Sequence, residues 1–598
     1  MGAESKNESP KKKGPKKKNI LIEHKPLVVG SMIAVVAIAG IVGGTIFYLS
    51  AGEEKRDTLI TNYEGLWWYD TLFKPPEIKL YLHNLFDNIK IISQIAEGLF
   101  EYEITNEYTR IVPNLALDGQ WSSDGLNLTC PLREGVKFHD GTPFNAYAVK
   151  WTFDRLHNLL NNISYLDLNK GWYGSDGKEI LNRTEIIDNY TVRFVLNRRF
   201  VPFKALLCSF QSYILSPSTA PANDFIDIDT NLIGTGPFKY NSSTFLYDPL
   251  WEGYWTANTT LLANPDYWDG RPKLNKLIFK FFEENWESGG YQKRYEAMIS
   301  REIQITKLFP FKPENYTSYP GITLDFYDSY WINYIAIKNS LINATMRKAI
   351  SYAINYTNIL TFEALNNEAG VIRARSPLSK GVLYSNWKDF DVPYFNITIA
   401  RQVLKDVNWN GTAGALTAND NITGGNEWES LVTNGTPLAI YNYTYIVWRW
   451  RHAFYKHVLA EALKQIGVEI NLIPTVNATE FSDKLKWSHF LQTGWHPDYN
   501  DPSNNINPMF SSKADGFANW GLVNDTLVQE WMEEGIIETN ETAREQLYYD
   551  IQKRLIEEVY PCIWTYTERY CEVHVSNLKG INYYLWACKP LLKEAYFE

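Results

Sequence analysis

Gly494 to Pro502 reads G-W-H-P-D-Y-N-D-P, and this stretch decides how the rest of the chain can be placed. The run before it ends in S-H-F-L at residues 488–491, a pattern that predicts a short buried strand. Pro497 and Pro502 restrict the backbone to extended or turn geometry, in which a helix cannot continue. The stretch is therefore predicted to be a rigid loop that begins where a strand ends.

This loop carries one carboxylate, Asp498, between two aromatic side chains, Trp495 and Tyr499. A carboxylate between aromatic walls in a half-buried cleft can pair with a cationic group of a ligand. Such a pair is far stronger there than at an exposed surface. The alternative is an ordinary turn in which Asp498 bonds only to nearby backbone. The loop alone leaves both interpretations open.

The composition is that of a large globular protein. The chain has 598 residues, of which 45% are hydrophobic and 21% charged, enough for two or more large lobes. Aromatic residues make up 15%, and they either fill cores or form stacking walls for a ligand. Residues 1–26 hold eight Lys against three Glu while the whole chain has a formal charge of -10, so the body is acidic. An acidic body argues against nucleic-acid binding.

The cysteine pattern indicates no metal or redox site. The five cysteines are Cys130, Cys208, Cys562, Cys571 and Cys588. No two of them have C-x-x-C spacing, so we predict neither a metal nor a cofactor. An odd number leaves at least one thiol free. In an extracellular body Cys562 and Cys571 are candidates for a disulfide across a terminal hairpin, although the spacing does not decide the pairing.

The chain lacks the motifs of hydrolytic enzymes, since neither G-x-S-x-G nor H-E-x-x-H occurs. His139 and Asp140 are adjacent in F-H-D-G-T-P, but adjacent residues of a D-G turn do not generally converge on one substrate atom. We therefore predict that the protein is not an enzyme.

The N-terminal segment predicts a single membrane anchor. Residues 27–49 carry no charge, and at about 1.5 Å per residue a helix of that length spans a bilayer core of about 30 Å. L-S-A at residues 49–51 is a poor signal-cleavage site, and Gly52 offers no cysteine for acylation. The expected order is a basic cytoplasmic tail (1–26), a transmembrane anchor (27–49), a linker (50–57) and an extracellular body.

The body contains about seventeen N-x-S/T sequons. Those that support an outside location include Asn127, Asn162, Asn182, Asn189, Asn241, Asn258, Asn315, Asn343, Asn396, Asn434, Asn477 and Asn524. Sequons accept glycans only in secreted chains, where a bulky glycan needs a surface position. A glycoprotein held by a protein anchor is expected, an arrangement archaeal in style.

Several spaced motifs accompany the loop at 494–502. They are E-G-L-F-E-Y (97–102), P-N-L-A (113–116), L-R-E-G-V-K-F-H-D-G (132–141), I-G-T-G-P-F (233–238), N-P-D-Y-W-D-G-R-P (264–272) and M-R-K-A-I-S-Y-A-I-N (346–355). Together they resemble the family 5 extracellular solute-binding proteins, which are peptide, nickel and opine receptors of ABC importers, and most closely the oligopeptide- and dipeptide-binding members. The family's usual G-E-I-D is R-E-I-Q at 301–304, and the segment before Ile89 departs from its pattern.

The resemblance implies an α/β, periplasmic-binding-protein-like fold with two lobes, a hinge and an extra N-terminal subdomain. Lobe I is expected over residues 58–330, with the subdomain at about 102–225. Lobe II is expected over 331–560, and residues 561–598 return to lobe I.

The local patterns add their own expectations. Helices are predicted from Ile89, at 146–156 after Asn145 as N-cap, at 453–467 and at 543–558. Strands at 438–448 and 468–473 flank the third of these helices, an order that indicates a parallel sheet. Residues 187–197 are predicted to form one strand, and the closing strands are expected from Pro561 to Val575.

The resemblance also implies a function. The expected protein is a monomeric receptor that captures a peptide between its lobes and delivers it to an ABC permease. Asp498 falls on the position that receives the peptide's α-amino group, with Trp495 and Tyr499 as pocket walls. Arg449 or Arg451 is expected to bind the carboxylate, because they precede a helix much as the family's Arg does. An oligosaccharide receptor of the same fold, or a transport-free sensor or adhesin, are the alternatives.

Removal of residues 1–52 should release a soluble, folded monomer, because 27–49 is the only long uncharged apolar run in the sequence. Fractionation after a salt wash and size-exclusion chromatography measure this. A truncated body that stays with the membrane after the wash would contradict the single anchor.

Overall fold

The computed structural model describes residues 57–64, 79–80, 86–104, 109–162, 172, 179–218, 226–227, 232–248, 253–282, 289–308, 311–367, 369–386, 389–407, 409, 427–434, 436–513, 518–584 and 589–598. They all belong to the unit Asp57–Glu598. The predicted tail, the anchor, the linker up to residue 56 and Cys588 lie outside the described residues. Within the described part, no helix has both the length and the apolar character needed to cross a membrane.

One large sheet of eleven strands organises this unit. Its strands, in spatial order, are β10 (Phe238–Asp248), β11 (Gly253–Ala263), β12 (Lys276–Phe282), β1 (Thr58–Glu64), β13 (Ile305–Lys307), β19 (Cys562–Val575), β14 (Ile322–Ile337), β18 (Phe490–Trp495), β16 (Ala439–Ile446) and β17 (Val468–Thr475), with β15 (Val371–Arg373) on β19. The sheet is therefore built from segments that are far apart in the sequence.

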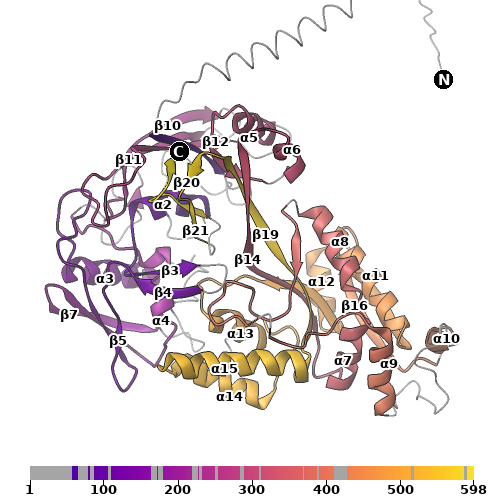
Figure 1. The fold of residues 1–598 in the computed structure, drawn as a ribbon. Helices are drawn as coiled ribbons and strands as arrows, with labels where there is room; N and C mark the ends of the chain where they lie inside the picture. Colours follow the sequence, from indigo (N-terminus) through magenta and orange to yellow (C-terminus); the bar gives the residue numbers. More distant parts are fainter. Residues whose placement is uncertain are drawn as a thin grey trace, which may run out of the picture. The chain divides into compact units, whose positions relative to one another are not determined.

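The two long strands in the middle of the sheet, β19 and β14, connect two groups of strands. One group runs from β10 to β13 in the spatial order, and the other consists of β18, β16 and β17. β14 and β19 pair antiparallel over most of their length, as Figure 1 shows. At one end β13 pairs with β19, and at the other β18 pairs with β14. The register of the β14–β19 pair shifts between Asp328 and Ile332. The lobe boundary predicted at 330–331 falls inside this irregular stretch, and the division into lobes stays a prediction.

Smaller sheets complete the strand content. A four-stranded sheet joins β5 (Gln120–Trp121), β6 (Asn127–Pro131), β8 (Thr191–Leu196) and β7 (Leu181–Asp188), and two-stranded pairs are β3 (Phe100–Ile104) with β4 (Thr109–Pro113), β2 (Lys79–Leu80) with β9 (Ile226–Asp227), β20 (Leu578–Lys579) with β23 (Tyr596–Phe597), and β21 (Asn582–Tyr584) with β22 (Lys589–Leu591).

The helices pack around these sheets, and apart from α12 each of them buries apolar residues. They are α2 (Phe86–Ile95), α3 (Ala146–Asn162), α4 (Phe203–Leu206), α5 (Gly290–Ile299), α6 (Pro313–Thr317), α7 (Ala344–Ala353), α8 (Tyr356–Asn366), α9 (Ile397–Asp406), α10 (Glu427–Thr433), α11 (Trp450–Lys464), α12 (Ala478–Leu485), α13 (Pro502–Phe510), α14 (Thr526–Ile537) and α15 (Glu541–Arg554). Three buried apolar clusters result, one around Leu277 of β12, one around Ile350 of α7 and one around Phe194 of β8.

Several local predictions are confirmed. A helix, α2, includes Ile89 and is followed by a strand. The side chain of Asn145 accepts the backbone N–H of Ala148 at 3.1 Å, so Asn145 does precede and cap α3. The strands on either side of α11, β16 and β17, pair in parallel. Strand, helix and parallel strand therefore follow one another as predicted.

Three expectations from the sequence are corrected. Residues 187–197 are not one strand, because Asp188 accepts the backbone N–H of Tyr190 at 2.8 Å and turns β7 into β8. The helix predicted to end at 558 is α-helical only to Arg554 and finishes as a π-helical turn. Cys562 and Cys571 lie on the same strand, β19, and both are free thiols, so the disulfide interpretation is wrong.

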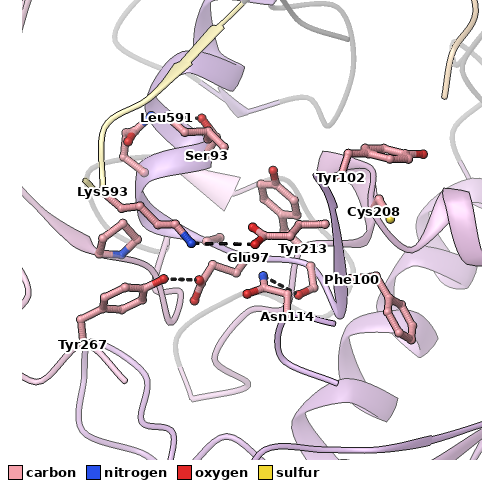
Figure 2. Close-up of a pocket in the computed structure, with 15 residues that line it drawn as sticks. Ser93, Glu97, Phe100, Tyr102, Asn114, Cys208, Tyr213, Tyr267, Leu591 and Lys593 are labelled. Atoms are coloured by element: carbon pink, nitrogen blue, oxygen red, sulfur yellow. Dashed lines mark hydrogen bonds and ion pairs between the residues drawn. The ribbon is translucent and has the colours of Figure 1, made fainter. Parts of the chain in front are cut away.

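The spaced motifs converge on one buried carboxylate, Glu97, just after α2. Tyr267 donates its hydroxyl to Glu97 Oε1 at 2.7 Å, and the two side chains point toward one another in Figure 2. Glu97 Oε2 accepts the Thr235 hydroxyl at 2.7 Å and the Trp268 indole N–H at 3.0 Å. Burial raises the pKa of Glu97, and these three donors lower it. The motifs at 97–102, 233–238 and 264–272 are thus parts of one hydrogen-bonded group.

Two glycines of the motif at 233–238 permit this close packing. The backbone N–H of Gly236 donates to the Ile95 carbonyl at 2.8 Å. A Cβ added at Gly234 would lie 2.3 Å from the same carbonyl oxygen, and one at Gly236 would lie 2.6 Å from it. Only glycine can therefore bring this turn against the end of α2. The motif at 132–141 joins this group through His139, because its backbone N–H donates to the Gly234 carbonyl at 3.0 Å.

Replacing Glu97 with Gln should lower the free energy of unfolding by about 1–3 kcal/mol, because an amide NH2 then faces donors and leaves one of them without an acceptor. Urea unfolding measures the change. The control is Glu134→Gln, which alters an exposed side chain and should change stability by about 0.5 kcal/mol or less. Equal midpoints for the two variants would contradict a structural role for Glu97.

Candidate functional site

The candidate site lies at the carboxyl ends of the parallel strands. β16 pairs in parallel with β17 along its length and with β18 at Tyr443 and Phe490. Carboxyl ends of neighbouring parallel strands share one edge of a sheet, and in open α/β sheets ligands bind outside that edge. The segment with Arg449 and Arg451 follows β16, and the loop with Asp498 follows β18. The fold thus brings the two predicted segments to the same edge.

The loop after β18 presents Asp498 to solvent. The Asp498 side chain is exposed, and its backbone N–H donates to the side-chain oxygen of Asn504 on α13. The indole N–H of Trp495 donates to the Asn504 carbonyl at 2.7 Å. Tyr499 is only 6% exposed and packs into the core. Trp495 is therefore half-buried at the surface of the core, whereas Tyr499 is part of that core.

The residues after Asp498 hold the loop in place. Asn500, which is buried, donates to the Tyr330 hydroxyl at 2.9 Å and to the Gly381 carbonyl at 3.0 Å. Asp501 accepts from Arg544 at 2.8 Å, and both side chains are buried. Asp501 also caps α13, which begins at Pro502. The predicted rigid loop is therefore short, because Pro502 starts a helix.

The structure adds one aromatic neighbour of the loop that the sequence did not indicate, Trp331. The rings of Trp331, on β14, and His496 lie 5.8 Å apart, and Trp331 is 38% exposed. A Cβ at Gly494 would lie 2.5 Å from Trp331 Nε1, so the glycine leaves room for this indole. Burial lowers the pKa of His496 to about 4, which keeps its ring neutral at physiological pH. Trp331, from the neighbouring strand, thus lies against His496 of the loop.

The two predicted arginines have different surroundings. Arg449 is exposed at the N-cap of α11, with its guanidinium 5.5 Å from the Trp448 ring. Arg451 pairs with the fully buried Glu363 at 3.1 Å and approaches Glu568 at 4.0 Å. Burial raises the pKa of Glu363, and the charge of Arg451 lowers it. Arg451 therefore neutralises an internal carboxylate, and among the described residues no ion pair engages Arg449.

A second group of charges lies at the shifted register of β14 and β19. Asp328 lies 3.4 Å from Lys380 Nζ and 3.6 Å from Arg569 Nε, and all three side chains are partly exposed. Arg569 also lies over the Phe326 ring at 4.9 Å. No local signal in the sequence could have found this group, because its members come from three separated segments.

One cavity, beside Glu97, is too small for an organic solute. Its volume is about 50 Å³, and Figure 2 shows its lining, including Tyr213 and Lys593. Lys593 lies 3.8 Å from Glu101 and 3.5 Å from Asp269. A cavity of this size and polarity has room for a few water molecules. It belongs to the structural group around Glu97.

His139 and Asp140 bond to different partners. His139 Nε2 lies 2.8 Å from the Gly236 carbonyl, and Asp140 accepts the Ser216 hydroxyl at 2.7 Å. Both side chains thus anchor a turn. In the part of the chain that the structure describes, no group of three His, Cys, Asp or Glu side chains is arranged to hold a metal ion.

Comparisons with known proteins identify relatives that cover much of the chain. Residues 110–517 match the family described as bacterial extracellular solute-binding proteins, family 5 Middle. The glutathione-binding protein GsiB of Pectobacterium atrosepticum is 24% identical over 501 residues, covering 81% of this chain and 85% of that protein. The dipeptide-binding protein of Escherichia coli (strain K12) is 26% identical over 369 residues, covering 57% of this chain and 59% of that protein.

A solved structure is similar in fold. The structure of HbpA2 from Haemophilus parasuis superposes with a TM-score of 0.69 at 19% identity, covering 90% of this chain and all of that one. The expected α/β, periplasmic-binding-protein-like fold is therefore confirmed.

Arg451→Ala should lower the free energy of unfolding by about 1–2 kcal/mol, because it leaves Glu363 buried without its cation while water screens part of the loss. The matched control, Arg449→Ala, should change it by about 0.5 kcal/mol or less. Thermal unfolding compares the two. Adding Glu363→Gln to Arg451→Ala should recover part of the lost stability. A double variant whose unfolding midpoint is equal to or lower than that of Arg451→Ala alone would contradict the pairing.

Proposed function

Because the chain belongs to the family 5 extracellular solute-binding proteins, we propose that its body captures peptides at the carboxyl edge of β16 and β18. Members of this family are binding receptors of ABC importers and not enzymes, and the chain is such a receptor. The peptide is then delivered to the permease subunits of the importer. The exposed carboxylate of Asp498 on its held loop is the observation that carries the peptide assignment.

Asp498 receives the α-amino group of the peptide in this proposal. Its loop is held by Asn504 and Asn500, so binding costs little ordering entropy. Trp495, in the same loop, and Trp331, which lies against His496, are partly exposed and offer apolar faces to peptide side chains. The names of relatives that bind glutathione and dipeptides agree with a ligand that carries a free amine.

Arg449 is the favoured partner for the carboxylate of the peptide. It is exposed beside Trp448 at the same edge of the sheet, and a guanidinium binds a carboxylate in bidentate geometry. Arg451 was an equal candidate from the sequence, but its pairing with Glu363 leaves less of it for a ligand. Tyr499 acts by supporting the loop.

The lobes close on the ligand by small backbone changes at the β14–β19 pair. That pair contains the register shift and the charges of Asp328, Lys380 and Arg569. A ligand stabilises the closed form only to the extent that it binds that form better than the open one. Closure also removes water from Asp498, which strengthens its pairing with an amine.

The body is proposed to be a monomer that residues 27–49 tether to the outer face of the cell membrane, with residues 1–26 in the cytoplasm. The uncharged run, the lysines before it and the sequons after it support this placement. A body outside the cell is also the compartment in which the sequons can carry glycans.

An oligosaccharide receptor is the second candidate. Exposed aromatic rings favour it, because sugars stack on such faces, and Trp448 and Trp450 are 64% and 50% exposed at the same edge. A neutral sugar offers no cation to Asp498, so the two candidates differ in their dependence on that charge.

Asp498→Asn should weaken binding of free-amine peptides by about 2–5 kcal/mol, or roughly thirtyfold to several thousandfold, because it removes the charge while keeping the shape. Isothermal titration calorimetry measures the affinities. N-acetylated versions of the same peptides should bind the native protein poorly and the variant equally poorly.

The matched control is Asp266→Asn, an exposed aspartate between β11 and β12 that should leave affinity unchanged. If Asp498→Asn binds free-amine peptides as tightly as the native protein does, the amine assignment is wrong. Tightest binding of neutral oligosaccharides by both proteins would favour the second candidate.

A further inference from the structure

Five sequon asparagines have a second role in the structure, as helix N-caps. They are Asn343 before α7, Asn355 before α8, Asn396 before α9, Asn477 before α12 and Asn540 before α15. In each, the side-chain oxygen accepts the backbone N–H three residues later, at 2.9, 3.2, 3.1, 2.9 and 3.0 Å in that order. The coincidence of sequon and cap is not visible in the sequence motif itself.

The cap uses only one of the two polar atoms of each side chain. An asparagine carries a carbonyl oxygen that accepts and an NH2 group that donates. Among the described residues, none of the five Nδ2 atoms has a hydrogen bond. Asn343, Asn477 and Asn540 are exposed, and Asn355 and Asn396 are half-buried. The oxygen thus faces the helix while the nitrogen remains available.

The third residue of each sequon is also accessible. Since the asparagine is the N-cap, the threonine stands at the second helical position. Four of these threonines are exposed and one is half-buried; in order along the chain they are Thr345, Thr357, Thr398, Thr479 and Thr542. Thr345 is the half-buried one.

We propose that these five asparagines carry N-linked glycans and that each helix keeps its cap after modification. The inference rests on the extracellular placement in the proposed function. An oligosaccharide comes from a lipid-linked phosphate donor: a bond forms between Nδ2 and the anomeric carbon, and the bond from that carbon to the phosphate oxygen breaks. The lipid phosphate leaves with the bonding electron pair, and the proton that Nδ2 loses passes to water. The carbonyl oxygen takes no part and continues to accept its backbone N–H.

Two other sequons provide an internal contrast. The Nδ2 atom of Asn442 donates to the Trp487 carbonyl at 3.2 Å, and Thr444 is 1% exposed. The Nδ2 atom of Asn182 donates to the Asn197 side chain at 2.7 Å, and the threonine of that sequon is also buried. In both sequons the threonine is buried and cannot be presented to a glycan-transferring enzyme, so these two sites remain unmodified.

The first test is mass spectrometry of peptides from the full chain, purified from the membranes of cells that make it. Peptides with each of the five capping asparagines should carry a glycan mass, and peptides with Asn182 and Asn442 should not. Unmodified caps beside modified sequons elsewhere would overturn the inference and leave the placement intact.

Matched variants distinguish the loss of the glycan from the loss of the capping hydrogen bond. Asn477→Asp keeps a capping oxygen and removes the acceptor nitrogen, whereas Asn477→Ala removes both. Thr479→Ala keeps the cap and destroys the sequon. All three should lose the same glycan mass, and only Asn477→Ala should also lose the stability that the cap provides. Equal unfolding midpoints for Asn477→Asp and Asn477→Ala would overturn the claim that the modified asparagine caps α12.

Protease treatment of intact cells distinguishes the two proposals. A body that is cleaved from outside but carries no glycan on any cap overturns the inference alone. A body protected from the protease overturns the extracellular placement, and the inference fails with it.

Discussion

Burying a carboxylate is costly unless hydrogen-bond donors surround it. Glu97, which lies just after α2, is such a buried carboxylate. Glu97 is stabilised by donors from two distant turns, Thr235 just before β10 and Tyr267 with Trp268 between β11 and β12. These hydrogen bonds to Glu97 therefore hold the segment that leads into β10 and the connection between β11 and β12 against the end of α2. The three-stranded run β10–β11–β12 adjoins β1 and so fixes one side of the large sheet.

The acidic residues divide into those that the fold neutralises and those that it presents to solvent. Asp501 and Glu363 are buried and paired with Arg544 and Arg451. Asp498 is three residues from Asp501 but exposed. The same division separates Arg451 from Arg449. A buried ion pair is costly to disrupt, so the paired members hold the scaffold, whereas Asp498 and Arg449 are exposed at the carboxyl edge.

Local signals predicted the helices and strands well where residues within or next to an element determine its ends and its type. Asn145 caps α3, and the strand, helix and strand around α11 are parallel as their order implied. The prediction failed where a turn was hidden inside an apparently continuous pattern. Asp188 ends β7 through a side-chain bond to the backbone, which alternation of apolar residues does not reveal.

By itself, the sequence determined the family, the fold class and the loop that carries Asp498, because these depend on motifs with fixed spacing and on residue types that restrict the backbone. Only the tertiary structure decided that the motifs meet at Glu97, that Trp331 lies beside Gly494, and that Arg451 but not Arg449 is paired with Glu363. The physical reason is that burial and ion pairing depend on residues far apart in the chain, and periodicity carries information only about near neighbours.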